Sequence, residues 1–203
     1  MHNIRQTRSV AARCGQLTVP EDYARPEGPK VELFVAVIPA RTKTPAPDAV
    51  TAIAGGPGGA ATDDYVNWGQ TAFSDLLKTR DIVLIDQRGT GRSNRFDCPF
   101  DPDGLADATP EEIKAANKAC IESFSGDPRF YTTTEAVKDL EAVRTALGYS
   151  KLNVYGVSYG TRVALEYLRR YPQSVRTTVL DGVAPADLAL GPGIPLAAQN
   201  ALD

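Results

Sequence analysis

Short apolar runs separated by turn-forming residues predict a set of β-strands. β-branched residues are concentrated in Leu17–Val19 and Val31–Ile38, and the turn-rich stretch between them indicates a strand pair. A further short apolar run spans Ala49–Ala54. The run Asp81–Asp86 is almost uninterrupted in its apolar character, which is typical of a parallel strand covered on both faces.

Three stretches carry the periodicity of helices. Thr132–Leu147 shows it most clearly, because apolar residues recur every three or four positions and Thr132 with Glu135 fits a capping box. Thr109–Ser123 is also predicted to be a helix, with Thr109 as N-cap and Pro110 at its first position, and Tyr159–Arg170 is predicted as a helix that Pro172 ends. In a fourth stretch, residues 62–79, we expect helix in the second half, with three apolar residues on one side: Phe73, Leu76 and Leu77.

Two later runs, Lys151–Val157 and Val175–Leu180, predict further strands. Because strands and helices alternate, the sequence predicts an α/β domain with a mainly parallel sheet, to which the initial strand pair adds an antiparallel edge. In such sheets, functional sites lie beyond the carboxyl ends of the strands.

Composition and charge exclude several classes of protein. Of the 203 residues, 42% are hydrophobic and 23% are charged, which is the composition of a globular chain. The formal net charge is −3 and no block of Lys and Arg stands out, so we expect no nucleic-acid partner. No run of 18 apolar residues occurs, so we expect no membrane span. The chain contains a single histidine, His2.

The strongest chemical signal is the pentapeptide Gly156-Val157-Ser158-Tyr159-Gly160, which follows a predicted strand and opens a predicted helix. A sharp turn there would strain the serine backbone and leave no room for side chains two positions away, which explains both glycines. The turn would hold the hydroxyl of Ser158 clear of the sheet as a nucleophile. The N–H of Tyr159, at the helix start, would stabilise an oxyanion. The alternative is a chance pentapeptide in an ordinary turn.

A glycine-rich loop, residues 55–59, follows the strand that ends at Ala54. Such a loop lets main-chain N–H groups approach a reacting carbonyl closely, so we expect Gly55 or Gly56 to supply a second oxyanion donor. A plain turn is the structural alternative. A phosphate-binding loop is the rival functional one, but no Gly-Lys-Ser/Thr sequence follows.

A second glycine-rich loop spans Asp86–Ser93. Its Gly-x-Gly turn suggests dinucleotide binding, but Asn94 stands where the third glycine of that motif belongs. We interpret this loop as structural, with Asp86 paired to Arg88 or Arg92 so that the ion pair shapes the floor of the site.

Taken in order, GGPGG (55–59), DQRGTGRSN (86–94) and GVSYGTRVALEYLRRYP (156–172) resemble the α/β-hydrolase fold, and more narrowly the proline iminopeptidase and tripeptidyl aminopeptidase group of serine peptidases. CGQLTVPEDY (14–23) is similar to the segment that opens the secreted tripeptidyl members. Proline iminopeptidases usually have a histidine before the first loop; Ala54 stands here, which favours the tripeptidyl branch. The resemblance implies a peptidase that releases short N-terminal pieces through an acyl-enzyme, without a cofactor or metal.

A serine nucleophile needs a base, and an acid that orients the base. In α/β-hydrolases both follow the serine, yet no histidine follows Ser158. His2 would reach the site only by an unusual wrap of the N-terminal arm. The acids that follow Ser158 are these: Glu166, Asp181, Asp187 and Asp203. Asp181, at a strand end, is the best placed of them, although the resemblance puts the family's acid one strand later.

The resemblance also implies that the chain stops before the lid and the last strands of the fold. We interpret residues 1–13 as an N-terminal arm, 14–186 as the N-terminal part of the hydrolase domain, and 187–203 as the start of the lid region or a disordered tail. Such a chain would hold the nucleophile without the base, and we expect it to be inactive alone.

Other functions stay open at this point. An esterase or another α/β-hydrolase would share the same motifs, with a small ester in place of a peptide as substrate. A catalytically inactive truncated domain fits the missing histidine. A nucleotide-binding α/β protein would need a phosphate loop that the sequence lacks.

The cysteines and the chain start bear on the cellular compartment. Cys98 and Cys120 flank a polar excursion and would staple it as a disulfide, leaving Cys14 over; the alternative is three free thiols. The first 13 residues lack the apolar core of a secretory signal, which predicts a cytoplasmic protein or a true start further upstream. The family resemblance suggests instead a periplasmic or secreted protein.

Overall fold

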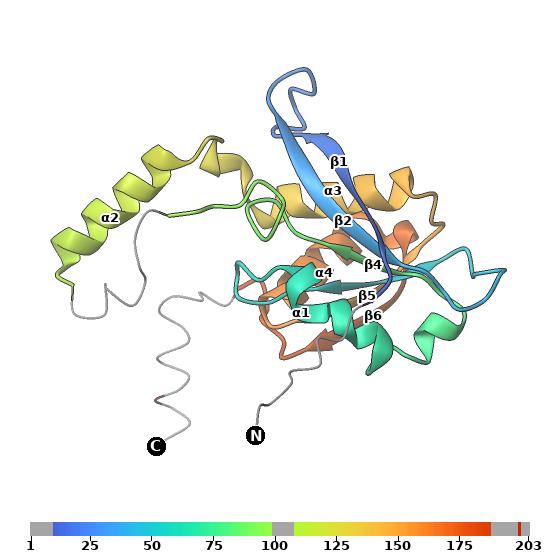
Figure 1. Cartoon of the computed structure of the whole chain (residues 1–203). Coiled ribbons are helices and arrows are strands. Elements are labelled where there is room, and N and C mark those ends of the chain that lie inside the picture. The colour runs from blue at the N-terminus through green and yellow to red at the C-terminus, as the bar shows by residue number, and fades with distance from the viewer. Residues whose placement is uncertain (1–9, 99–107, 188–198, 200–203) are drawn as a thin grey trace, which may run out of the picture.

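The computed structural model describes residues 10–98, 108–187 and 199, and within them six strands form one mixed sheet in the order β1-β2-β4-β3-β5-β6 (Figure 1). The strands are β1 (Arg13–Pro20), β2 (Lys30–Ile38), β3 (Ala49–Ile53), β4 (Ile82–Ile85), β5 (Leu152–Val157) and β6 (Val175–Asp181). β1 pairs with β2 and β2 with β4 in antiparallel fashion, whereas β3 runs parallel to β4 and β5, and β5 to β6. The prediction of a mainly parallel sheet with an antiparallel N-terminal pair is confirmed.

Helices connect the strands of this sheet. They are α1 (Ala61–Tyr65), α2 (Pro110–Ser123), α3 (Thr133–Ala146) and α4 (Tyr159–Arg170), with short 3₁₀ turns η1 (Val66–Gln70), η2 (Leu76–Lys78), η4 (Pro128–Phe130) and η5 (Pro172–Ser174). No helix within the described ranges has the length and apolar character that crossing a membrane requires.

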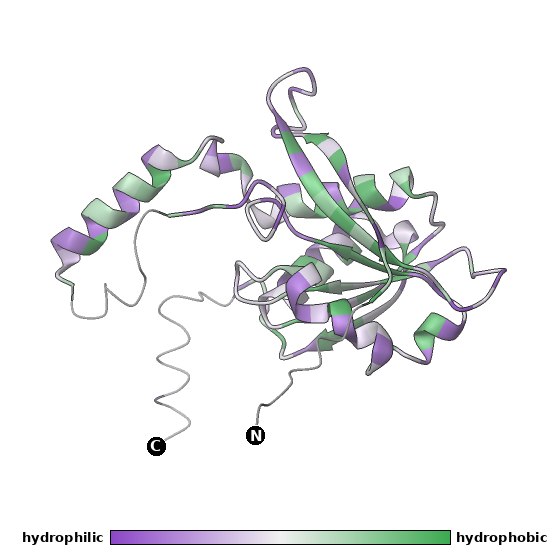
Figure 2. Cartoon of the chain, viewed as in Figure 1, coloured by the Kyte–Doolittle hydropathy of each residue, from purple (hydrophilic) through white to green (hydrophobic). Residues whose placement is uncertain are grey.

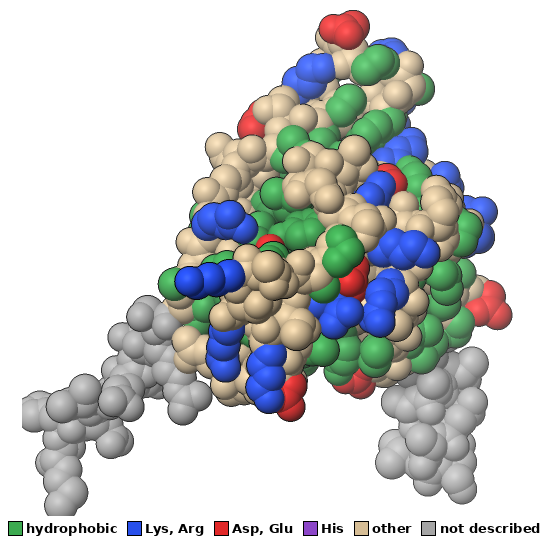
Figure 3. All heavy atoms as spheres, turned by 90° about the vertical axis from the view of Figure 1, so that its right-hand side faces the viewer, with side chains coloured by type: hydrophobic (Ala, Val, Ile, Leu, Met, Phe, Trp, Pro, Cys, Tyr) green, Lys and Arg blue, Asp and Glu red, His purple; other side chains and the backbone are tan. Residues whose placement is uncertain are grey.

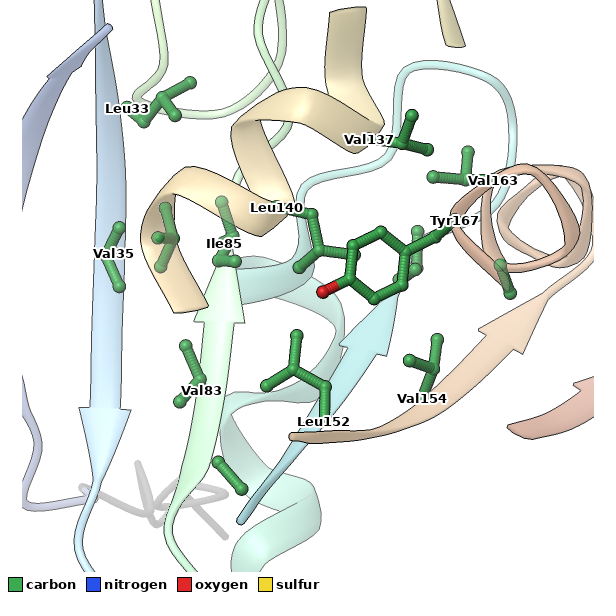
Figure 4. Close-up of a cluster of buried hydrophobic side chains, with 14 of the residues drawn as sticks. Leu33, Val35, Val83, Ile85, Val137, Leu140, Leu152, Val154, Val163 and Tyr167 are labelled. Carbon is green, nitrogen blue, oxygen red and sulfur yellow. The ribbon is translucent and has the colours of Figure 1, made fainter. Parts of the chain in front are cut away.

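The core consists of two apolar layers, one on each face of the sheet. On one face, α3 and α4 pack on the strands through residues such as Leu140 and Tyr167, and Tyr167 is fully buried (Figure 4). On the other face, α1 and the turns after it cover the strands through Tyr65, Phe73 and Leu77. All four residues of β4 are buried, as expected for a strand covered on both sides. Figure 2 shows the sheet as the most continuously hydrophobic part of the chain.

The predicted helix in the second half of residues 62–79 is wrong. The structure has an α-helix only at the beginning, then isolated 3₁₀ turns, and Leu76 is 39% exposed. Tertiary packing is the reason: the ring of Trp68 lies edge-on against Tyr65, Phe73 and Tyr155, which holds the segment in tight turns. Aromatic pairs of this kind add stability beyond their buried area.

The excursion between β4 and α3 stands apart from the sheet, and α2 projects from the rest of the molecule (Figure 1). Within the excursion a disulfide joins Cys98 to Cys120 of α2, while Cys14 is a free, exposed thiol. Close by, the rings of Phe96 and Phe124 stack with their centroids 3.8 Å apart. On the face shown in Figure 3, Lys and Arg side chains lie in several separate places rather than in one block.

Candidate active site

Ser158 occupies a strained turn between β5 and α4. Its backbone has φ 53° and ψ −120°, a region that a residue with a side chain rarely adopts, and its side chain is exposed. The neighbouring chain holds it there: its N–H donates to the carbonyl of Asp181 at 2.8 Å. Its own carbonyl accepts both the N–H and the hydroxyl of Thr161, at 2.9 and 2.6 Å. The turn predicted from the sequence is therefore present, with these bonds offsetting its strain.

The flanking glycines are required by close backbone approach. A Cβ added to Gly156 would lie 2.5 Å from the carbonyl oxygen of Gly160. A Cβ on Gly160 would lie 2.2 Å from the carbonyl oxygen of Ile53, at the end of β3. Both distances are far below contact, so α4 begins directly against the sheet only because these side chains are absent.

The first glycine-rich loop lies beside Ser158. A Cβ on Gly55 would be 3.0 Å from Cβ of Ser158 and 3.6 Å from its hydroxyl oxygen. The loop turns back on itself through a bond from the N–H of Gly59 to the carbonyl of Gly55 at 3.1 Å, and Gly56 has φ 107°. On the other side, Tyr159 is the first residue of α4, so its N–H has no acceptor within the helix. The sequence-predicted donors and nucleophile thus come together.

Asp181 closes β6 next to this turn. Its carboxylate accepts the hydroxyl of Tyr155 at 2.6 Å, a bond that raises the pKa of Tyr155, and its carbonyl accepts the N–H of Ser158. The residue is exposed and its carboxylate already has a partner on the neighbouring strand. These contacts position the serine turn from the adjacent strand.

The predicted ion pair of Asp86 with Arg88 or Arg92 is wrong. Asp86 is fully buried, and its carboxylate accepts the N–H and hydroxyl of Thr62 at 3.0 and 2.9 Å and the main-chain N–H of Arg92 at 3.1 Å. The side chain of Arg92 lies over the ring of Phe34 instead. Neutral donors from α1 and from its own loop satisfy this carboxylate, so it ties the second loop to the start of α1.

Arg88 pairs with a residue that the sequence did not single out. Its guanidinium binds both carboxylate oxygens of Asp139 at 2.6 Å, and both side chains are almost completely buried. The remaining donors go to the carbonyls of Pro20, Glu21 and Phe130. A signal for this partner was present, because Asp139 is a carboxylate within the apolar stripe of α3.

Among the remaining acid candidates, Glu166 and Asp187 lie within the described residues, and Asp187 is exposed. Glu166 is near the end of α4, where Arg169 and Arg170 bind it. His2 and Asp203 fall outside the described residues, as does nearly all of the segment 187–203.

A serine in a sharp turn between a strand and a helix, on a sheet of this topology, is the arrangement of α/β-hydrolases. Comparison with known proteins agrees with this class. A family model described as the alpha/beta hydrolase fold matches residues 50–200, and the chain belongs to that family.

Among curated relatives, the chain is similar to a tripeptidyl aminopeptidase of Streptomyces lividans, with 34% identity over 194 residues that cover 84% of this chain and 35% of the relative. It is also similar to serine protease Hip1 of Mycobacterium tuberculosis H37Rv, with 32% identity over 190 residues, 84% of this chain and 36% of the relative. The chain therefore spans about a third of the length of these relatives.

Among solved structures, it resembles a proline iminopeptidase-related protein from Thermus thermophilus. The TM-score is 0.50 at 28% identity, covering 83% of this chain and 44% of that one.

Proposed function

We propose that this chain carries the nucleophile and the oxyanion donors of a serine peptidase that releases short pieces from the N-terminus of peptides. The observation that carries the proposal is the exposed Ser158 at φ 53°, with Gly55 against its side chain and the start of α4 directly behind it. The names of the relatives, a tripeptidyl aminopeptidase and a serine protease, support peptides as the substrate class.

The chemistry that follows is acyl transfer to water. The hydroxyl oxygen of Ser158 bonds to the substrate carbonyl carbon while a base takes its proton, and the carbonyl oxygen becomes an oxyanion. The N–H of Tyr159 and the N–H of Gly55 or Gly56 would donate to it. The base then gives the proton to the leaving amine as the C–N bond breaks. Water attacks the acyl-enzyme in the same way and releases the acid.

The general base of α/β-hydrolases is a histidine that follows the nucleophile in the chain, and these 203 residues contain none in that position. The one histidine of the chain is His2, and none follows Ser158. Loss of the base leaves roughly 10³–10⁴-fold rate enhancement over water in a serine hydrolase. We therefore propose that residues 14–186 are the N-terminal part of a hydrolase domain, and that these 203 residues alone turn over slowly, behaving as a nearly inactive domain.

Chemical rescue tests this proposal. Added imidazole can act as the missing base, so hydrolysis of a p-nitrophenyl ester by the chain should rise with imidazole beyond the rate of imidazole alone. Ser158→Ala should abolish that increase and should abolish labelling by a fluorophosphonate. Ser150→Ala, which removes an exposed hydroxyl bonded to the carbonyl of Pro47, serves as the matched control and should behave like the parent chain.

Two results would contradict the proposal. Equal rescue in Ser158→Ala and in the parent chain would show that the serine is not the nucleophile. Fast turnover without imidazole that disappears in Ser158→Ala but persists in His2→Ala would show that the chain holds a base other than histidine.

A further inference from the structure

A cavity of about 180 Å³ lies between the two glycine-rich loops, next to the serine turn. Pro57 and Gly58 line it from the first loop, and Tyr159, the residue after Ser158, lines it from the start of α4. The opposite side is formed by the second loop and the excursion: Gly89, Thr90, Phe96 and Tyr131. The cavity therefore shares two of its walls with the proposed oxyanion donors.

Packed aromatic rings hold the far wall in place. Tyr131 meets Phe124 and Phe96 edge-on, with ring centroids 4.8 and 6.2 Å away. Gly89 has φ 82°, and a Cβ there would lie 3.0 Å from the Tyr131 ring, so the ring lies directly on the loop backbone. On the near side, the hydroxyl of Tyr159 is 2.7 Å from that of Thr133. These contacts make the cavity preformed.

The lining presents no unpaired charge. Arg88 is the charged residue among those that line the cavity. Its guanidinium is bound by Asp139 and by three main-chain carbonyls, which uses all five N–H donors. The cavity is open on one side, so a charged group entering it would lose part of its hydration without gaining a partner. The cavity therefore favours uncharged groups.

Its size sets a second limit. A buried cavity of about 150 Å³ is enough to hold one benzene molecule. The cavity beside Ser158 is slightly larger, so a branched aliphatic or an aromatic side chain fits it. The aromatic walls suit such groups, because apolar side chains and rings pack well on them.

We propose that this cavity is the subsite for the side chain of the residue whose carbonyl Ser158 attacks, and that it selects uncharged, leucine- to phenylalanine-sized side chains. The inference rests on the proposed serine hydrolase function, because that function places the scissile carbonyl beside the cavity. It adds the substrate preference, which that function leaves unspecified.

Binding measured without turnover tests the subsite independently of the nucleophile. N-acetyl-phenylalaninamide should shift the backbone amide NMR signals of Gly58 and Gly89 in the full chain, and also in Ser158→Ala. N-acetyl-lysinamide should leave them unchanged at the same concentration. Absence of shifts with the phenylalanine compound, or equal shifts with both, would overturn the subsite whatever the role of Ser158.

Turnover then assigns the subsite to the acyl side. In the imidazole-rescued reaction, p-nitrophenyl esters of N-acetyl-phenylalanine and N-acetyl-glycine share one leaving group, and the phenylalanyl ester should react faster. Phe96→Ala removes one wall and should reduce this preference roughly tenfold, the size of one aromatic contact. Ile121→Ala removes an exposed side chain of α2 that does not line the cavity, and should keep the preference within about twofold.

A filling variant covers the case in which Phe96→Ala does not fold. Ala136 lines the cavity from α3, and Ala136→Leu should slow the phenylalanyl ester while leaving the glycyl ester close to the parent rate. If Ser158-dependent hydrolysis of the glycyl ester is present but neither variant changes the preference, the subsite is wrong while the hydrolase function stands. If that hydrolysis is absent, the hydrolase function fails, and the amide-binding experiment decides the cavity alone.

Discussion

At the scale of single residues, the serine turn depends on two positions that have no side chain. Ser158 can adopt a positive φ because its N–H and carbonyl are both bonded, to Asp181 and to Thr161. The helix can begin at once because Gly156 and Gly160 have no Cβ where the backbone of another segment passes. Thr161 adds a link, since its hydroxyl also accepts the N–H of Ala184 beyond β6, at 2.8 Å.

Gly160→Ala should therefore destabilise the chain. The added Cβ would be 2.2 Å from the carbonyl oxygen of Ile53, so backbone must move, and overpacking of this kind costs about 1–3 kcal/mol. The free energy of unfolding in urea measures the effect. Gly15→Ala is the matched control, because nothing lies within 4 Å of its added Cβ, and it should be neutral or slightly stabilising. Equal effects of the two substitutions would refute the steric argument.

At the scale of elements, local signals at the helix ends were informative. α2 begins with the N-cap predicted at Thr109, and the structure adds a full capping box: the hydroxyl of Thr109 accepts the N–H of Glu112, whose carboxylate accepts the N–H of Thr109. The box predicted for α3 forms only in half. Thr132 caps the N–H of Glu135, but the carboxylate of Glu135 binds Lys138. The difference between the two helices is that Lys138, one turn further along α3, binds the carboxylate of Glu135.

The C-terminal end of α4 makes stability depend on pH. Hydrogen bonds from Arg169 and Arg170 lower the pKa of Glu166 from 4.5 to about 2. A carboxyl whose folded pKa is lowered stabilises the fold above its unfolded pKa, and this contribution is lost as pH falls towards the folded pKa. Glu166→Gln should thus lower the free energy of unfolding at pH 6, and its difference from the parent should shrink between about pH 5 and 2.

Urea unfolding across this pH range is the measurement. Glu32→Gln removes an exposed carboxylate of β2 and is the control, and its free energy of unfolding should stay close to that of the parent chain. A constant gap between Glu166→Gln and the parent chain would argue against the ion-pair cause.

At the scale of the whole molecule, Arg88 joins segments that are far apart in the sequence. Its donors reach the end of β1, the turn before α3 and α3 itself. The hydroxyl of Tyr23 also donates to Asp139. The pKa of Tyr23 is raised, mainly by burial and secondly by the nearby carboxylate of Asp139. The second loop is thereby fixed to the antiparallel edge of the sheet, which steadies the floor beneath the proposed subsite.

Asp139→Asn should be one of the most damaging single changes in the described structure. It leaves the guanidinium of Arg88 buried without its counter-charge, and breaking a buried pair in this way costs about 3–5 kcal/mol. The urea midpoint and the thermal midpoint should both fall. Asp97→Asn breaks the pair with Arg95, in which both side chains are mostly exposed, and should leave both midpoints nearly unchanged. A small effect of Asp139→Asn would mean that the pair is dispensable.

Much of the architecture was readable from local pattern. Local signals predicted several elements, because each signal involves residues that are close together in the chain. Examples are the apolar run at residues 81–86, the caps of α2 and α3, and the helical stretch of α4. The family match confirms the predicted hydrolase fold. This fold could be predicted because the glycines on both sides of the serine, between strand and helix, are a steric requirement that is visible in the sequence. The proposed roles of Ser158, Tyr159 and Gly55 remain predictions.

The sequence by itself determined the order of the strands and of the three longer helices, the serine turn and its two glycines, because those depend on residues a few positions apart. Only the tertiary structure decided which carboxylate pairs with Arg88, how residues 66–79 turn, and that rings from the excursion line a cavity next to the serine turn. Those choices join groups that are distant in the chain, such as Arg88 and Asp139, which are 51 positions apart. Burial and partner geometry select among several chemically equivalent side chains, and no local pattern carries that information.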